Sequence, residues 1–447
     1  MLKLTIKILS IAVFALLSVS LSPLYAATDE SVADDSSAYA EDQTFQIDQV
    51  VYAGNNVTRE RLLNQQLYFS VPAEVTGKVL AESVQNIRDL GLFETVESRL
   101  EAIDGSQRYQ LHISLKEKFY LIPLPRLGLN SDGETSYGAS LEWDNIAGLN
   151  QRVKFVWERR QLQDESLGER EVFRLNYDYP RICGSLWNGG FFTNNTRVPV
   201  EEAPEDGGRT YVSKTQRHGI SLGRQLSPNG QTKGWFIEGS AFYLFDDNEP
   251  RTSVPELAGG STWAMSFGAR YENRQLFTYT EQGVQFEIGL ELSLPIANPD
   301  FAYNRLAGEW RYVTPGLAGK EHHSVIYRAG FGIFNGGIPE QTGFSNRSSN
   351  LRGLKKGEIE GNALLFGSVE YLLPVHRKTP SLRYGLFLDV AVFGRDYTEL
   401  CACDLQYSVG AVLVWRPRKL VKVELRGEYG YNINQKSSRP GGGLTRF

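Results

Sequence analysis

A two-residue alternation between apolar and polar side chains recurs along this chain from residue 118 onward. The segment 421–431, VKVELRGEYGY, is one example, because neighbouring side chains of an extended strand point to opposite faces. One face would carry Val421, Val423, Leu425, Tyr429 and Tyr431. The other would carry Lys422, Glu424, Arg426 and Glu428. Such a strand fits a soluble sheet and also a membrane barrel, whose outer face meets lipid and whose inner face meets a wet lumen.

Several further segments share this alternation, and their number and length favour the barrel. GVQFEIGLELSL (283–294), TWAMSFGARY (262–271) and LRYGLFLDVAV (382–392) are each about as long as a strand that crosses a bilayer. Aromatic residues of the kind found at membrane interfaces lie at strand ends, at Trp157, Trp235, Trp310, Tyr312 and Trp415. We therefore predict an all-β transmembrane barrel of about sixteen antiparallel strands over residues 118–447. The apolar face of 421–431 should then meet lipid and its charged face should line the lumen.

The N-terminus predicts export from the cytoplasm, which together with the predicted barrel indicates the bacterial outer membrane. Lys3 and Lys7 precede the apolar run 8–19, and small residues follow at Ala26 and Ala27, which is typical of a secretory signal peptide over residues 1–26. A membrane anchor is the alternative, but the run is short for a span. Residues 27–43 are acidic and rich in Ser and Ala, which predicts a disordered spacer. The net charge of −5 gives no electrostatic reason to expect a nucleic-acid partner.

Residues 44–117 predict a small periplasmic α/β domain with the order β-α-α-β-β. A strand over FQIDQVVYAG is followed by a helix that Asn55 or Asn56 could cap, and a second helix lies between Thr76 as cap and Gly91 as stop. Two strands follow, joined by the hairpin signal Asp104-Gly105. This unit, with GLF leading into its third element, resembles a POTRA (polypeptide-transport-associated) domain, and a single copy is visible.

Two motifs in the predicted barrel carry a second resemblance. The segment 349–375, SNLRGLKKGEIEGNALLFGSVEYLLPV, and the strand GLFLDVAVFG resemble the outer-membrane assembly and secretion β-barrel superfamily, also called the bacterial surface antigen family. That family carries an Arg-Gly-aromatic tip on its sixth outer loop, which corresponds here to Arg352, Gly353 and Leu354. Its Phe-x-Asp-x-Gly strand motif corresponds to Phe387 and Asp389, with Ala391 in place of glycine.

The resemblance implies that the loop folds into the lumen. By strand alternation Asp389 and Glu370 point inward, so Arg352 could pair with either of them there. A solvated arginine on a surface loop is the alternative. The family also implies its partners: unfolded outer-membrane or secreted polypeptides, the lipid bilayer and periplasmic accessory proteins.

The two end strands of the barrel predict a weak seam. Pro123 and Pro125 lie in the first strand and cannot donate hydrogen bonds, and Gly441, Gly442 and Gly443 precede Phe447 in the last strand. Such strands could part sideways and offer their edges to a client by β-augmentation. Alternatively, the prolines belong to a linker and the glycines to a loop.

The sequence shows no motif for bond chemistry, so we expect no enzyme, cofactor or metal site. There is no G-x-S-x-G, H-E-x-x-H or C-x-x-C, and the neighbouring His322 and His323 should point to opposite faces. Cys401 and Cys403 could form a disulfide in an outer loop, whereas Cys183 lies at the other end of the barrel. The expected function is insertion or export of polypeptide clients through the seam or lumen. The alternatives are a dedicated secretion pore for one partner protein, a passive porin and a barrel-borne hydrolase.

Overall fold

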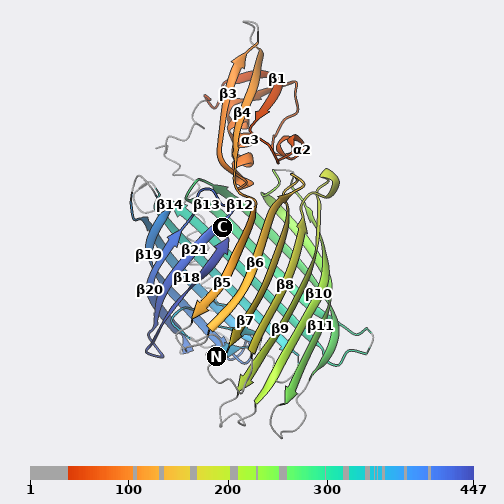
Figure 1. Ribbon diagram of the computed structural model, residues 1–447, viewed down its shortest axis with the longest axis vertical. Coiled ribbons are helices and arrows are strands. Elements are labelled where there is room, and N and C mark those ends of the chain that lie inside the picture. The colour runs from red at the N-terminus through yellow and green to blue at the C-terminus, as the bar shows by residue number, and fades with distance from the viewer. Residues whose placement is uncertain are drawn as a thin grey trace.

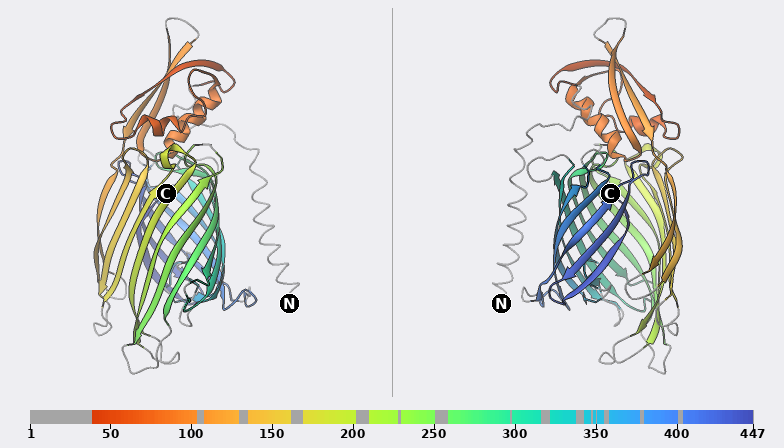
Figure 2. Two further views of the ribbon diagram at one scale, coloured as in Figure 1. Left: turned by 90° about the vertical axis from the view of Figure 1, so that its right-hand side faces the viewer. Right: turned by 60° about the vertical axis from the view of Figure 1, so that its left-hand side comes forward.

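The computed structural model shows a small α/β domain at one end of a large β-barrel (Figures 1 and 2). It describes residues 39–103, 108–129, 135–161, 169–201, 210–227, 230–250, 259–296, 298–315, 322–337, 343–346, 348–349, 351–354, 358–376, 380–400 and 404–446. The predicted signal peptide, the spacer up to residue 38, the Asp104-Gly105 turn, Cys401, Cys403 and Phe447 lie outside these ranges. No helix within them is long and apolar enough to cross a bilayer.

The α/β domain contains one strand more than the sequence pattern predicted. Its elements are β1 (Thr44–Ala53), α2 (Glu60–Asn64), β2 (Ala73–Thr76), α3 (Gly77–Asp89), β3 (Phe93–Ala102) and β4 (Arg108–Glu117). They form a sheet of order β2-β1-β4-β3 in which only β1 and β4 run parallel. β2 was missed because four residues are too few to show a clear alternation.

The helix boundaries of this domain follow the predicted caps in one helix and depart from them in the other. Thr76 caps α3 by accepting a hydrogen bond from the Val79 amide, and Gly91 beyond its end has φ +70°. α2 begins at Glu60 after Arg59, which makes no side-chain cap. The prediction that Asn55 or Asn56 caps this helix was therefore wrong: Asn55 instead donates to the Thr58 carbonyl, within the loop that precedes the helix.

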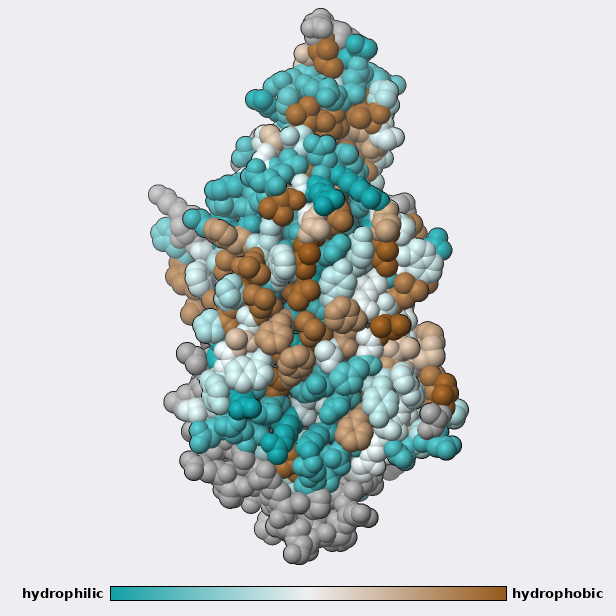
Figure 3. Space-filling view, turned by 45° about the vertical axis from the view of Figure 1, so that its right-hand side comes forward, coloured by the Kyte–Doolittle hydropathy of each residue, from teal (hydrophilic) through white to brown (hydrophobic). Residues whose placement is uncertain are grey.

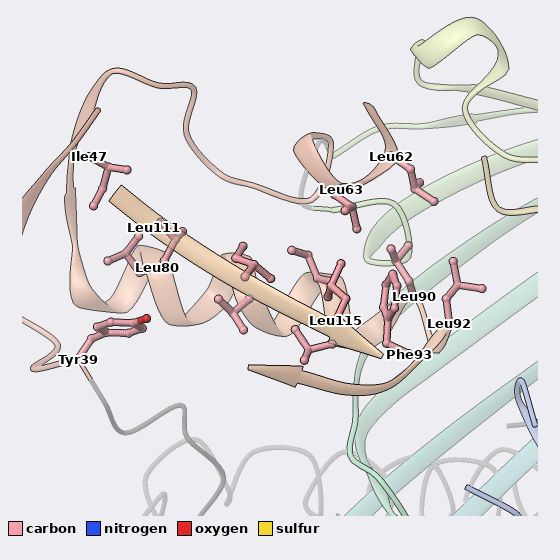
Figure 4. Packing of buried hydrophobic residues seen from close by; sticks show 14 of the residues in the cluster. Tyr39, Ile47, Leu62, Leu63, Leu80, Leu90, Leu92, Phe93, Leu111 and Leu115 are labelled. Atoms are coloured by element: carbon pink, nitrogen blue, oxygen red, sulfur yellow. The ribbon is translucent and has the colours of Figure 1, made fainter. Parts of the chain in front are cut away.

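The core of the α/β domain lies between α3 and the sheet, as Figure 4 shows. Leu80 and Ile87 of α3 pack with Leu111 and Ile113 of β4, and all four side chains are fully buried. Val421, from the other end of the chain, belongs to the same core. It does not face lipid as predicted, because the turn that carries it is inserted into this domain.

Sixteen antiparallel strands form the barrel, each paired with its neighbours along the chain. Their bounds are β5 Leu121–Leu129, β6 Thr135–Ile146, β7 Gln151–Gln161, β8 Glu169–Tyr179, β9 Trp187–Glu201, β10 Thr210–Gln225, β11 Gly234–Pro250, β12 Gly260–Leu276, β13 Glu281–Leu294, β14 Tyr303–Pro315, β15 Ser324–Gly336, β18 Ala363–Pro374, β19 Leu382–Gly394, β20 Gln406–Trp415, β21 Val423–Asn432 and β22 Ser437–Arg446. The predicted fold class is confirmed. Because the number of strands is even, β5 begins and β22 ends at the side of the α/β domain (Figure 1).

The outer and inner faces of the barrel differ as the alternation predicts. On β19, Tyr384, Leu386 and Leu388 are exposed on the outside, whereas Arg383 and Asp389 are buried on the inside. Figure 3 shows apolar surface gathered around the middle of the strands, with hydrophilic surface toward both ends. An apolar band between two polar rims is the arrangement that a lipid bilayer requires.

Within 421–431 the prediction holds from Glu424 onward and fails at Val421 and Val423. Leu425, Tyr429 and Tyr431 are exposed on the outside, while Glu424 is buried on the inside. β21 begins only at Val423, which is itself buried, so the prediction that Val423 meets lipid was also wrong. The residue before it, Lys422, lies in a turn with φ +49°.

Candidate functional site

The loop between β15 and β18 folds back into the lumen. Its described part contains the two-stranded piece β16 (Phe344–Ser345) and β17 (Glu360–Gly361). Leu351, just before the tip, and Leu354, the last residue of the tip, are buried in a cluster with side chains of several barrel strands. Leu354 thus fills an apolar site at the position where the resembling family has an aromatic residue. The cluster also contains Phe242, Leu244, Ala264, Phe301, Tyr303, Phe334, Phe344, Leu364, Phe366 and Ala391.

Arg352, at the loop tip, binds the two carboxylates that strand alternation turns inward. Its Nε and Nη2 atoms lie 2.8 Å and 2.6 Å from the two carboxylate oxygens of Asp389, a bidentate contact. Its Nη1 lies 2.9 Å from Glu370 Oε2 and 3.5 Å from Glu428 Oε2. Arg352 and both of its main partners are buried. The structure therefore places this arginine inside the barrel and not on an outer surface.

β19, the strand that carries Asp389, also supplies an aromatic partner for the Arg352 guanidinium. The Arg352 Cζ atom lies 3.3 Å from the centroid of the Phe387 ring, a cation–π contact. Ser368 of β18 donates a hydrogen bond of 2.7 Å to Asp389 and so holds the carboxylate that faces Arg352. Phe387 and Asp389, two residues apart on β19, thus bind the arginine through its π face and its N–H edge respectively.

Gly353 brings the loop tip against the backbone of β21 and a side chain of β22. Its φ is +86°, and a Cβ atom there would lie 2.8 Å from the Asn432 amide nitrogen and 2.9 Å from the Gly430 carbonyl carbon. Ser437 of β22 donates a hydrogen bond of 2.9 Å to the Gly353 carbonyl. Only glycine allows this backbone conformation and this close approach together. The loop tip is therefore attached to β19, β21 and β22.

β5 and β22 are the two ends of the sheet, and among the described strands neither has a second partner. β5 pairs with β6 from Leu121 to Leu129, so Pro123 and Pro125 lie within a strand and not in a linker. Gly441, Gly442 and Gly443 lie within β22, opposite β21. Prolines are accommodated in edge strands, because an edge has no neighbour that needs their missing N–H.

The chain just before β5 contacts a barrel turn at the side of the α/β domain. The Phe119 amide donates a hydrogen bond of 2.9 Å to the Lys419 carbonyl, and Phe119 forms a parallel bridge with Leu420. Both partners lie in the turn between β20 and β21. The start of β5 is thus joined to the turn between β20 and β21 at the side of the α/β domain, and among the described residues no ladder joins β5 to β22.

The α/β domain is docked on the turns at this end of the barrel. Asp89 of α3 accepts a hydrogen bond of 2.7 Å from the Leu276 amide, and its second carboxylate oxygen lies 2.5 Å from Lys233 Nζ. Gln66 accepts a hydrogen bond of 2.8 Å from the Gln231 amide. Burial raises the pKa of Asp89, although Lys233 and the hydrogen bonds from Leu276 and Gln85 oppose this rise.

The surroundings of Lys118, in the link between the domain and β5, shift the pKa of its ammonium group. Burial, together with the nearby cations of Arg416 and Arg418, lowers the pKa of Lys118 to about 8, while Glu94 opposes this shift. In the unfolded chain the pKa of a lysine is about 10.4. Between these pH values the unfolded chain holds a proton that the folded protein has lost, so folding stability rises with pH across this window.

We therefore expect the melting temperature of the purified protein to include a contribution that rises between about pH 8 and about pH 10.4. The variant Lys118→Met should lack this contribution, because no titrating group remains there. Lys233→Met serves as a control, since it removes a lysine from the same interface and leaves Lys118 in place. An unchanged rise in Lys118→Met would assign the pH dependence to another group.

Other residues highlighted by the sequence do not gather into a site. His323 contacts the Tyr371 hydroxyl at 2.8 Å and His322 lies edge-on to Tyr279, so the two histidines do not converge. Cys183 is exposed, with a free thiol, in the turn between β8 and β9. Within the described ranges, no group of three or more His, Cys, Asp and Glu side chains is placed to hold a metal ion.

Sequence reasoning missed the charged residues that continue from the loop tip into the lumen. Arg426 of β21 contacts Glu370, which also binds Arg352. Farther along, Arg416 lies 2.6 Å from Glu424 and 3.2 Å from Glu281. Alternation does turn Glu424, Arg426 and Glu281 inward, but it does not show which of them meet across the barrel.

A barrel-shaped sheet of sixteen membrane-length strands, an inward loop and a docked α/β domain define an outer-membrane β-barrel with a periplasmic N-terminal part. Residues 145–438, more than half of the chain, match the family model described as the Omp85 superfamily domain. The chain belongs to the Omp85 superfamily, whose members act in outer-membrane protein assembly and secretion. The expected family and location are confirmed.

Three solved structures share this fold. CdiB from Escherichia coli is 12% identical with a TM-score of 0.60, and the match covers 90% of this chain and 74% of that one. CdiB from Acinetobacter baumannii is 14% identical with a TM-score of 0.57, covering 90% and 73%. BamA from Haemophilus ducreyi, in a form lacking POTRA domains 1–3, is 17% identical with a TM-score of 0.53, covering 90% and 85%. At these identities the likeness concerns the fold.

Proposed function

We propose that this protein inserts or exports polypeptide clients by parting β5 from β22. The observation that carries the proposal is the pair of sheet ends that lack a ladder to each other. Parting ordinary neighbouring strands would break a row of backbone hydrogen bonds, whereas parting these two breaks no described ladder. The free N–H and C=O groups of an edge can pair with an incoming strand of almost any sequence.

In this proposal the loop tip acts as a latch on the seam. Arg352 joins the tip to β18 and β19, and the Gly353 carbonyl joins it to Ser437 of β22. While the tip is in place, β22 is attached to the barrel wall by more than its pairing with β21. Release of the tip would leave β22 free to move with a client strand.

Residues 44–117 are proposed to act as a single POTRA-like domain that captures clients in the periplasm. β2 and β3 are the two ends of its sheet, so each has one edge without a strand partner among the described residues. The proposed clients are unfolded outer-membrane or secreted polypeptides, delivered with the help of periplasmic accessory proteins. The proposed chain organisation is a signal peptide over 1–26, a spacer over 27–43 and a barrel over 118–447. The prediction of disorder is wrong for the end of this spacer, because Tyr39 packs in the core of the α/β domain and the Gln43 carbonyl accepts a hydrogen bond from the Gly77 amide.

Crosslinking across the seam tests the proposal. In a background with all three cysteines replaced by serine, single cysteines placed in 121–126 and in 440–443 are joined by a bifunctional reagent in membranes. We expect seam locking to stop client assembly or export, seen as accumulation of unfolded outer-membrane or secreted proteins, while the barrel stays folded.

A matched control joins two neighbouring strands that remain paired. Val369 of β18 and Leu388 of β19 lie opposite each other and are both exposed on the outside. A crosslink between Val369→Cys and Leu388→Cys should leave client traffic unchanged. If seam-locked protein works as well as this control, the seam is structural and lateral opening is not the mechanism.

A further inference from the structure

The turn between β20 and β21 contacts the α/β domain on one side and the lumen on the other. On the domain side, Val421 is fully buried in the domain core, and Arg418 Nε lies 3.2 Å from Glu94 Oε1. The Lys419 carbonyl accepts a hydrogen bond from Phe119. We call residues 416–422 the coupling turn. In the sequence it connects two barrel strands, β20 and β21, but its Val421 side chain packs in the core of the α/β domain.

On the lumen side, the Arg416 side chain reaches across the lumen to a strand that is not a neighbour of β20. Its Nη2 lies 3.2 Å from Glu281 at the start of β13, and its Nη1 donates to the Tyr279 carbonyl at 3.3 Å. Four strands, β19, β18, β15 and β14, lie between β20 and β13 in the sheet. Arg416 and Glu281 are 3% and 2% exposed at their side chains, so this contact is excluded from water. A buried ion pair of this kind cannot shift without leaving a charge uncompensated.

From Arg416 a row of alternating charges leads to the loop tip. Arg416 Nε lies 2.6 Å from Glu424, and Glu424 lies 3.5 Å from Arg426. Arg426 contacts Glu370, and Glu370 lies 2.9 Å from Arg352. Every member of this row is at most 15% exposed at its side chain. The row therefore connects the coupling turn to the residue that holds the loop tip in place.

We propose that the coupling turn links the position of the α/β domain to the position of the lumen loop. If the domain shifts, Val421 leaves its core or carries the turn with it, and Arg416 must then change its partners. Glu424 and Arg426 would be rearranged in consequence, and the contact of Arg352 with Glu370 would weaken. This coupling is a property of the resting protein and does not depend on client transport. Because coupling between sites is reciprocal, release of the loop tip must also loosen Val421.

The experiment measures thiol labelling of two buried positions in protein whose native cysteines are replaced by serine. Ser349→Cys reports on the loop, because Ser349 is 1% exposed and cysteine has a similar size. Val421→Cys reports on the domain side, because Val421 is fully buried. We expect Arg416→Gln and Glu424→Gln each to accelerate maleimide labelling of Ser349→Cys by about fivefold or more, the lower range of coupling between sites. Arg352→Gln should accelerate labelling of Val421→Cys by a comparable factor.

Arg152→Gln provides the matched control. Arg152 also faces the lumen at this end of the barrel, but its partner Asp178, at 2.6 Å, lies on the neighbouring strand and outside the row. This variant should change neither labelling rate. Heat-dependent migration in gels confirms that each barrel is folded before labelling. Unchanged Ser349→Cys labelling in Arg416→Gln and Glu424→Gln overturns the proposal, as does equal acceleration by Arg152→Gln.

Discussion

Replacement of Arg352 by methionine should destabilise the barrel by about 3–5 kcal/mol and abolish client assembly or export. Asp389 is fully buried and Glu370 nearly so, and both direct their carboxylates at this guanidinium. Without it, the Asp389 carboxylate has no cation in a site shielded from water, Glu370 keeps only Arg426, and the Phe387 ring loses its cation. The loss of stability is measured by denaturant unfolding of the folded protein in detergent or lipid.

A charge-neutral variant separates the cost of uncompensated carboxylates from the function of the latch. Arg352→Met combined with Asp389→Asn removes one charge of each sign and leaves Glu370 paired with Arg426, so much of the lost stability should return. Client assembly should remain defective, because the tip still lacks its attachment to β18 and β19. If Arg352→Met alone is as stable as the wild type, Arg352 does not hold the loop. If the double variant regains full function, the ion pair is not the latch.

Replacement of Gly353 by alanine should displace the loop tip from β21. A side chain at φ +86° costs about 1–3 kcal/mol in backbone strain. The added Cβ would also collide with backbone atoms of Gly430 and Asn432, which belong to a paired strand and cannot move aside easily. We expect faster protease cleavage of residues 343–354 in membranes and a loss of client assembly comparable to that of the Arg352 variant.

Gly427→Ala is the matched control for this experiment. Gly427 lies on the same strand, three residues before Gly430, and an added Cβ there meets no atom within 4 Å. Its protease sensitivity and client assembly should equal those of the wild type. Wild-type behaviour of Gly353→Ala would contradict the close packing of the tip against β21.

The sequence was sufficient to predict the barrel because strand alternation is a local property. It identified the inward direction of Asp389 and Glu370 from their neighbours alone, and the outward direction of Leu425, Tyr429 and Tyr431. The motif around Arg352 pointed to a lumen loop only through resemblance to a family. Nothing in the local pattern around this arginine separates a buried position from a solvated one.

The errors arose where distant parts of the chain meet. Val421 continues the alternation of β21, so the pattern placed it toward lipid, but the core of the α/β domain covers it. The contact between Arg416 and Glu281 joins residues far apart in sequence and depends on how the barrel closes. Strand alternation predicts which residues face the lumen. Which of these residues contact each other depends on the three-dimensional shape of the barrel.

The docking of the α/β domain relies largely on main-chain groups of the barrel turns. Arg59 donates to the Gly148 carbonyl, Asp89 accepts from the Leu276 amide, Gln66 accepts from the Gln231 amide and Arg61 contacts the Cys183 carbonyl. Every residue type offers a carbonyl, and every type except proline offers an amide. The turns could thus diverge in side chains among descendants of this protein while the domain stays seated. Evolutionary constraint at this interface should fall on turn length and on the avoidance of proline at positions 231 and 276.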